Sequence, residues 1–373
     1  MPITRATAIL ILMLMIAGTQ SPAQTEKKLD SIFTEAGLNQ QNAPGAAVMV
    51  LKHGQVLFTR AYGVTDLPSK AKISSSTNFR LASDSKQFTA MSIMLLVHDG
   101  KLHYEDHLTD VFPDFPAYGK AITIRQLLQH TSGLKDYEDL MPPADPNVPV
   151  EQIQIQDAGV LDLLKQQTAT KFTPGSKWDY SNSGYVVLGL VVGKVSGKSF
   201  PDFLHERIFV PLGMTHTLAY VRGGPQVPNR AFGHSLEAGK WKQTDQSPTS
   251  ATLGDGGIYS SLRDLAKWDR ALREHTLLSV REMQAALTPV KPPNGAPTEP
   301  DGAPADYGFG WFLNPYKGHQ RMWHYGETMG FLSAIQRFTK DDLTIVVLCN
   351  RTDVNPTALA LKVADELLPQ STK

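Results

Sequence analysis

The chain has 373 residues, 41% of them hydrophobic, and its 36 basic side chains balance 36 acidic ones to a net charge of +0. This length and apolar content suit a large globular unit and argue against disorder. A chain without net charge has no overall field to attract a polyanion, so nucleic-acid binding is not expected.

The first segment has the layout of a secretory signal. Arg5 precedes an apolar or small run over 6–18, and Ser21-Pro-Ala23 follows as a small-x-small cleavage site. We predict a signal peptide over 1–23, cleaved after Ala23, and a secreted or periplasmic protein. The apolar run is too short to span a bilayer comfortably, so no stable membrane association is expected once the signal is removed.

The predicted elements form three groups along the chain. After a helix over 28–41, the run GAAVMVLKHGQVLFTRAYGVTD predicts two strands joined near 52–55. Helical spacing then dominates to about residue 280, with segments at 88–97, 124–129, 160–166, 185–195, 201–208 and 262–272. The β-rich runs YGFGWFL, HQRMWHYG, GFLSAIQRFTKDD and LTIVVLCN and a helix over 355–368 follow. Strands at both ends around a helical middle predict an α/β fold of the α+β type, with one sheet made from both ends.

Two other features refine this prediction. The Pro- and Gly-rich segments 135–153 and 223–248 have the length of lids or binding rims. The single cysteine, Cys349, lies in the apolar run LTIVVLCN, which excludes an intramolecular disulfide and indicates a buried core residue.

The stretch ASDSK places Ser83 three residues before Lys86. On a helix these positions share a face, and a lysine that its surroundings hold neutral can take the proton of a nucleophilic serine. Ser83 also opens a long apolar helix, whose positive N-terminal end suits a developing oxyanion. The alternative is that Ser83, Asp84 or Ser85 caps this helix while Lys86 is solvated, and residues 83–86 alone favour capping.

The same SxxK spacing recurs at Ser69/Lys72 and at Ser132/Lys135, so the motif is weak without its context. Ser69 and Lys72 lie in a polar turn with no following helix, and Gly133 interrupts the second pair.

Two further groups carry side chains suited to catalysis. Tyr180 and Asn182, in WDYSN, supply a proton carrier and an amide for a substrate carbonyl, unless the stretch is only a capping loop. His324, in WHYGE, lies in a strand edge where Gly326 lets a substrate approach the backbone. A lone histidine in a strand is more often structural.

The three groups together, in this order, resemble the serine β-lactamase and penicillin-binding protein superfamily. The resemblance is to its class C β-lactamase-like branch, which includes esterases, D-amino-acid peptidases and DD-carboxypeptidases. SDSK is similar to the SxxK motif, YSN to YxN, and HYG to the position of KTG or HxG. The stretches ITIRQLLQHTSGL, IFVPLGMTHT and GDGGIYSSLRDLAKW extend the likeness over nearly the whole mature chain.

The resemblance implies roles for the matching residues. Ser83 would be the acylated nucleophile, Lys86 would take its proton, and Tyr180 would pass protons to the leaving group. Asn182 would bind a substrate carbonyl, and the backbone N–H groups of Ser83 and Glu327 would form the oxyanion hole. Whether Lys86 or Tyr180 is the base stays open, because their protons are coupled.

The resemblance also implies a substrate-binding place for His324 and Gly326, and a scaffold role for 126–133 and 256–257. The implied fold is an antiparallel sheet built from both chain ends and flanked by terminal helices, with an inserted helical domain. The sheet domain would comprise 24–82 and 290–373, the helical domain 83–289, and the catalytic unit 24–373.

One departure from the motifs bears on the substrate. His324 stands where β-lactamases have a lysine, and a histidine is only partly charged near neutral pH, which weakens an anchor for a β-lactam carboxylate. The sequence therefore favours a secreted serine hydrolase that cleaves an ester or a small amide or D-amino-acid peptide through an acyl-enzyme on Ser83. A β-lactamase or DD-carboxypeptidase acting on β-lactams or peptidoglycan peptides is the alternative. A noncatalytic binding or sensor protein of the same fold is a third.

The expected partner is a small-molecule substrate. No cofactor and no metal are expected, because the 11 histidines are scattered without paired ligand spacing. The oligomeric state stays open.

Overall fold

The computed structural model describes residues 21–369, so most of the predicted signal peptide lies outside the described residues. Residues 21–23 begin helix α1 (Pro22–Glu35), where the Ser21 side chain accepts a hydrogen bond from the Gln24 N–H. Between residues 21 and 369, no helix has the length and apolar content needed to cross a bilayer.

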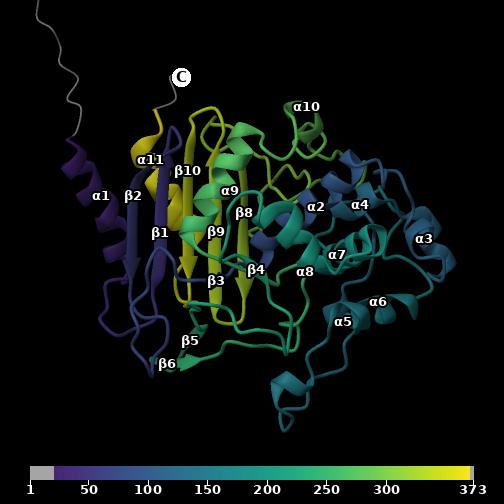
Figure 1. Ribbon diagram of the computed structural model, residues 1–373, viewed down its shortest axis with the longest axis horizontal. Coiled ribbons are helices and arrows are strands. Elements are labelled where there is room, and N and C mark those ends of the chain that lie inside the picture. The colour runs from purple at the N-terminus through teal and green to yellow at the C-terminus, as the bar shows by residue number, and fades with distance from the viewer. Residues whose placement is uncertain (1–20, 370–373) are drawn as a thin grey trace, which may run out of the picture.

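An antiparallel five-stranded sheet in the order β2-β1-β10-β9-β8 forms the centre of the described chain (Figure 1). β1 pairs with β10, and Ala46 lies opposite Cys349, so the two ends of the chain meet in one sheet. This confirms the predicted fold class. The strands are β1 (Ala46–Lys52), β2 (Gln55–Tyr62), β8 (Arg321–Thr328), β9 (Phe331–Phe338) and β10 (Leu343–Cys349).

The sheet has helices on both faces, which explains why its central strands read as continuous apolar runs. In β1, residues 46, 48 and 50 pack on the side of α1 and α11 (Pro356–Leu367), and residues 47, 49 and 51 pack on the side of α9 (Leu262–Glu274). Figure 1 shows α1 and α11 side by side and α9 crossing the other face. Cys349 is a free thiol in the α1/α11 core, as predicted.

A helical region lies beside the sheet and is centred on α2 (Lys86–His98) and α7 (Asn182–Ser196), which pack on each other. Residues 86–96 of α2 are all buried, so the helix that follows Ser83 lies in the core of this region. The smaller helices are α3 (Leu108–Val111), α4 (Ile124–Leu128), α5 (Tyr137–Leu140), α6 (Asp157–Lys165), α8 (Phe200–Leu204) and α10 (Val280–Met283).

The segment YGFGWFL forms a loop instead of the predicted strand. Tyr307 and Phe312 meet in an isolated bridge, and Gly310, with φ of 74°, turns the chain between them. A Cβ on Gly308 would lie 1.9 Å from the Ala286 carbonyl oxygen, so this backbone passes too close to its neighbour for any side chain. The loop passes close to the start of α2, where a Cβ on Gly310 would lie 2.8 Å from the Lys86 carbonyl oxygen.

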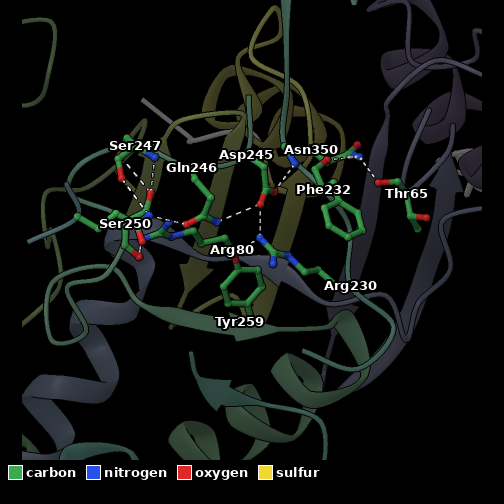
Figure 2. A network of polar contacts seen from close by, with 12 residues as sticks. Thr65, Arg80, Arg230, Phe232, Asp245, Gln246, Ser247, Ser250, Tyr259 and Asn350 are labelled. Carbon is green, nitrogen blue, oxygen red and sulfur yellow. Dashed lines mark hydrogen bonds and ion pairs between the residues drawn. The ribbon is translucent and has the colours of Figure 1, made fainter. Parts of the chain in front are cut away.

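The long segment 223–248 is tied to the body of the protein by a polar network (Figure 2). Arg230 forms an ion pair with Asp245 and donates a hydrogen bond of 2.9 Å to Tyr259 Oη. Asp245 also accepts the Gly233 N–H at 2.7 Å. Within this segment lies a hairpin of β5 (His234–Glu237) and β6 (Lys240–Gln243).

Candidate active site

Ser83 lies on a tight turn between a short strand and α2. Strand β3 (Phe79–Arg80) pairs with β7 (Ile258–Ser260) and leads into the 3₁₀ turn Ala82–Ser85, which continues into the helix. Ala82 has φ of 48°, a left-handed conformation that costs an L-residue about 1–2 kcal/mol. The turn therefore needs support from its neighbours, and it leaves Ser83 partly exposed between buried residues.

Helix capping does not explain these side chains. Ser85 stands at the N-cap of α2 without a side-chain cap bond in the described structure, and its Oγ instead accepts the Ile258 N–H at 3.1 Å. Asp84 lies 2.6 Å from the Ser333 hydroxyl, and Ser83 contacts Lys86. The capping alternative for residues 83–85 is therefore wrong.

Lys86 is fully buried, and its Nζ lies 2.9 Å from each of three oxygen atoms. These are Ser83 Oγ, Asn182 Oδ1 and the carbonyl oxygen of Asp255, so a protonated Lys86 uses all three of its donors. Burial lowers the pKa of Lys86 to about 8, although nearby carboxylates oppose the shift. A neutral Lys86 has a lone pair that can take the Ser83 proton.

Tyr180 and Asn182 lie at the start of α7, which the Ser181 side chain caps by accepting the Gly184 N–H at 3.1 Å. The stretch YSN is thus a helix cap that also holds Asn182 against Lys86. The Tyr180 ring centroid lies 4.9 Å from Lys86 Nζ.

The Tyr180 hydroxyl is buried and has no partner of hydrogen-bond geometry among the described residues. Burial raises the pKa of Tyr180 well above its ordinary value, and the nearby Ser83 hydroxyl opposes this only in part. The phenol keeps its proton near neutral pH, so it is suited to donate a proton.

The outer edge of β8 carries the candidate oxyanion donor. The N–H and C=O of Trp323 bond to Phe312 outside the sheet, at 2.9 and 2.8 Å. Because backbone direction alternates along an antiparallel strand, the Glu327 N–H, four residues on, points to the same outer edge. The Glu327 side chain is exposed.

Gly326 lets the turn that carries Ser83 approach β8. A Cβ on Gly326 would lie 2.0 Å from the Leu81 carbonyl oxygen and 2.4 Å from Ser333 Oγ. No larger residue fits between the strand and the turn. This close contact brings the outer edge of β8 near Ser83.

A chain of hydrogen bonds links His324 to His130 through the Tyr307 hydroxyl. Tyr307 Oη lies 3.2 Å from His324 Nε2 and 3.1 Å from His130 Nε2. His130 Nδ1 accepts the Ser181 N–H at 3.0 Å, so a neutral His130 carries its proton on Nε2 and donates to Tyr307. The Tyr307 hydroxyl and His324 Nε2 form the next link of the chain, and His324 Nδ1 accepts the Tyr325 N–H at 3.0 Å and lies 2.7 Å from the Tyr325 carbonyl oxygen.

This geometry corrects the expectation that His324 is partly charged. The side chain is fully buried, and burial together with the nearby Lys86 lowers the pKa of His324 to about 3. Both ring nitrogens are engaged within the protein. His324 therefore offers the substrate neither a positive charge nor a free donor in this structure.

Carboxylates gather around Asn182. Its backbone N–H donates to Asp136 at 3.4 Å, and its side-chain amide donates to the exposed Glu138 at 3.4 Å. Partial desolvation of the two carboxyl groups, together with repulsion from neighbouring carboxylates, raises the pKa of both Asp136 and Glu138. In the described part of the chain, no cluster of three or more His, Cys, Asp or Glu side chains is arranged to hold a metal ion.

Three residues of this site lie outside the motifs that the sequence singles out. Asp255 supplies a carbonyl oxygen to Lys86, and His130 and Tyr307 orient His324. GDGG and HTSG look like scaffold in the sequence, and Tyr307 falls in a predicted strand. His130 could have been proposed as a site residue because it lies in ITIRQLLQHTSGL, a stretch that carries the family resemblance.

Comparisons with known proteins show the family of this chain. The family model described as "Beta-lactamase" matches residues 29–368. Penicillin-binding protein 4* of Bacillus subtilis (strain 168) is 32% identical over 356 residues, which cover 92% of this chain and 76% of that protein.

Solved structures show the same fold. The penicillin-binding protein from Bacillus halodurans aligns with a TM-score of 0.76 and 26% identity, over 91% of this chain and 100% of that one. The D-amino acid amidase from Ochrobactrum anthropi SV3 aligns with a TM-score of 0.75 and 24% identity, over 91% of this chain and 96% of that one. With a family model that covers most of its length and a penicillin-binding relative of this identity, the chain belongs to the Beta-lactamase family.

Proposed function

We propose that this protein is a secreted serine hydrolase that cleaves a small ester or amide, including D-amino-acid amides and peptides, through an acyl-enzyme on Ser83. The observation that carries the proposal is the contact of 2.9 Å between the buried Lys86 amine and the partly exposed Ser83 hydroxyl. A binding protein has no need of a buried amine beside an accessible serine.

In the proposed acylation step, neutral Lys86 takes the proton of Ser83 Oγ while the oxygen attacks the substrate carbonyl carbon. Burial lowers the pKa of Lys86 to about 8 and raises that of Tyr180, which supports Lys86 as the base. Tyr180 then delivers its proton to the leaving group as the bond between carbonyl and leaving group breaks, and the proton that Lys86 took from Ser83 replaces it, so both side chains return to their neutral forms. In the second step Lys86 and Tyr180 take a proton from the water that attacks the acyl carbon and return it to Ser83 Oγ as the acid leaves.

Backbone geometry supports the remaining roles. The N–H groups of Ser83 and Glu327 are proposed to hold the oxyanion, since β8 directs the second of them to its outer edge. Asn182 is proposed to bind a substrate carbonyl through its side-chain amide, which already contacts Lys86 and Glu138.

Charge supports substrates without a carboxylate near the scissile bond. His324 is neutral, and Asp136 and Glu138 lie beside Asn182. A neutral ester meets no repulsion there, and the free ammonium group of an amino-acid amide meets attraction. A structural neighbour that is a D-amino acid amidase agrees with this substrate class.

A second candidate function is penicillin binding or DD-carboxypeptidase activity. It is favoured by the relationship to Penicillin-binding protein 4*. Such substrates bear a carboxylate, for which His324 provides no cation.

The test compares a chromogenic butyrate ester, a D-alanyl anilide and a chromogenic cephalosporin with wild-type protein and Ser83→Ala. We expect turnover of the ester and the anilide, and none with Ser83→Ala. Ser69→Ala, at the exposed SxxK match, is the control and should behave as wild type. Turnover that survives Ser83→Ala would falsify the acyl-enzyme, and rapid cephalosporin hydrolysis would favour the second candidate.

Secretion is tested by N-terminal sequencing of the exported protein, which should begin after Ala23.

A further inference from the structure

The turn that carries Ser83 is fastened to the sheet by a contact between two buried side chains, Asp84 and Ser333. Asp84 immediately follows Ser83, and Ser333 on β9 lies opposite Gly326 on β8. The contact therefore joins the residue after Ser83 to the strand pair that ends in the Glu327 N–H. It thus links the two elements that carry the proposed oxyanion donors.

The number of available protons decides which group donates in the contact between Asp84 and Ser333. Ser333 Oγ lies 2.6 Å from Asp84 Oδ2 and 2.9 Å from the Leu81 carbonyl oxygen. A serine hydroxyl has one proton, and a carbonyl oxygen has none, so Ser333 must donate to make a hydrogen bond with Leu81. Both contacts are hydrogen bonds only when Asp84 carries a proton on Oδ2 and donates it to Ser333.

The surroundings of Asp84 also favour the neutral acid. Asp84 is fully buried, and its Oδ1 has no hydrogen-bond partner within residues 21–369. An unpartnered carbonyl oxygen costs far less than an unpartnered carboxylate oxygen. Lys86 on α2 and Tyr180 before α7 act on this group electrostatically, and β8 presents the neutral His324 and the exposed side chain of Glu327.

We propose that Asp84 is a positioning residue that is held as the protonated acid, and that its hydrogen bond to Ser333 Oγ fixes the Ser83 turn against β8. Burial raises the pKa of Asp84 to about 7, with Ser333 and Lys86 opposing, in agreement with this geometry. Ionisation of Asp84 removes this donor, so Ser333 Oγ turns its single proton to the carboxylate and the Ser83 turn loses the hydrogen bond at the Leu81 carbonyl oxygen. The inference rests on the proposed acyl-enzyme on Ser83.

The decisive variant is Asp84→Asn, whose amide donates to Ser333 at every pH. Ester turnover is measured between about pH 6 and pH 9 for wild type, Asp84→Asn, Asp84→Ala and Ser333→Ala. We expect Asp84→Asn to match wild type at the acid end and to exceed it about tenfold at the alkaline end. Asp84→Ala and Ser333→Ala should lose about tenfold in kcat at the acid end, with KM within about twofold, and should approach wild type at the alkaline end, where Asp84 is ionised.

Two outcomes overturn the proposal: Asp84→Asn as impaired as Asp84→Ala at the acid end, or Asp84→Ala as active as wild type at the acid end. A second measurement does not depend on turnover. Because the folded state holds the Asp84 proton more tightly than the unfolded state, the wild type should lose stability relative to Asp84→Asn as the pH rises from about 4 to 7. If the free energies of unfolding of wild type and Asp84→Asn in urea differ by the same amount at every pH, Asp84 is not protonated as proposed. Turnover that persists in Ser83→Ala counts only against the proposed function.

Discussion

At the scale of single residues, the chemistry depends on one buried amine. Lys86 is protonated well below pH 8 and must lose that proton before it can act as the base. The folded structure and the reaction therefore require different forms of Lys86. The charged form donates all three hydrogen bonds, whereas only the neutral form can take the proton of Ser83.

We predict that kcat/KM for a neutral ester rises about tenfold per pH unit between about pH 5 and pH 7, as the neutral fraction of Lys86 grows. Lys86→Gln should lower kcat/KM by about 10²–10⁴ and remove this slope. Lys72→Gln, at the exposed SxxK match, is the control and should keep the wild-type profile. A flat wild-type profile in this range would rule out Lys86 as the base.

The Tyr307 hydroxyl gives a second prediction at this scale. Tyr307→Phe leaves buried nitrogens of His130 and His324 without partners, so it should lower the free energy of unfolding by about 1–3 kcal/mol. Tyr316→Phe removes a hydroxyl that bonds the exposed Asp365, and it should change stability by less than about 0.5 kcal/mol. Urea titrations compare the two, and equal losses would argue against the Tyr307 chain.

The sequence predicts single site residues that lie in motifs, but not contacts that form only when distant segments pack together. Ser83, Lys86 and Asn182 are found from motif spacing, and the structure brings them together; their catalytic roles stay predictions. Asp84 and Ser333 could not be paired from the sequence, since 249 positions separate them and only the packing of the turn on β9 joins them. The same holds for the charge of His324, because burial depends on the whole fold.

At the scale of elements, the helices and strands that the sequence predicts are those with long apolar runs, such as α7, β1 and β10. YGFGWFL has the composition of a strand, but Gly308 and Gly310 serve close backbone contacts that no local pattern reveals. The segment 223–248 looks like a loop in the sequence, and its hairpin depends on an ion pair with Arg230.

We predict that Arg230→Met destabilises the protein by about 2–3 kcal/mol, since it leaves the mostly buried Asp245 carboxylate without its cation. The double variant Arg230→Met/Asp245→Asn should recover part of this loss. The exposed Arg222→Met is the control and should stay within about 0.5 kcal/mol of wild type. If the loss in the free energy of unfolding of the double variant equals the sum of the losses of the two single variants, the two side chains are not coupled.

At the scale of the whole molecule, the site lies where segments from distant parts of the chain meet. Ser83 follows the first strands, Asn182 begins α7, and Gly326 lies near the end of the chain on β8. The pairing of β1 with β10 closes the sheet that supports β9 and β8, and α1 and α11 cover one face of it. One sheet therefore has two roles. The face covered by α1 and α11 stabilises the ends of the chain, and strands β8 and β9 support the geometry of the site.

This arrangement gives a prediction at the scale of the fold. Phe33 on α1 is fully buried, and its ring centroid lies 6.2 Å from that of Phe58 and 6.0 Å from that of Tyr62. Phe33→Ala should reduce the free energy of unfolding by about 3–5 kcal/mol through the cavity that it leaves. Ester turnover per folded molecule should stay at the wild-type value, because Phe33 belongs to the α1/α11 core, which includes no described residue of β8 or of the Ser83 turn.

The measurement pairs urea unfolding with turnover at low temperature, and the exposed Lys27→Ala is the control on the same helix. Turnover that falls in step with stability while the protein is still fully folded would show that the α1/α11 face controls the geometry of the site. Unchanged turnover with a lower unfolding midpoint would show that this face holds the sheet together, and that β8 and β9 alone present the oxyanion edge to Ser83.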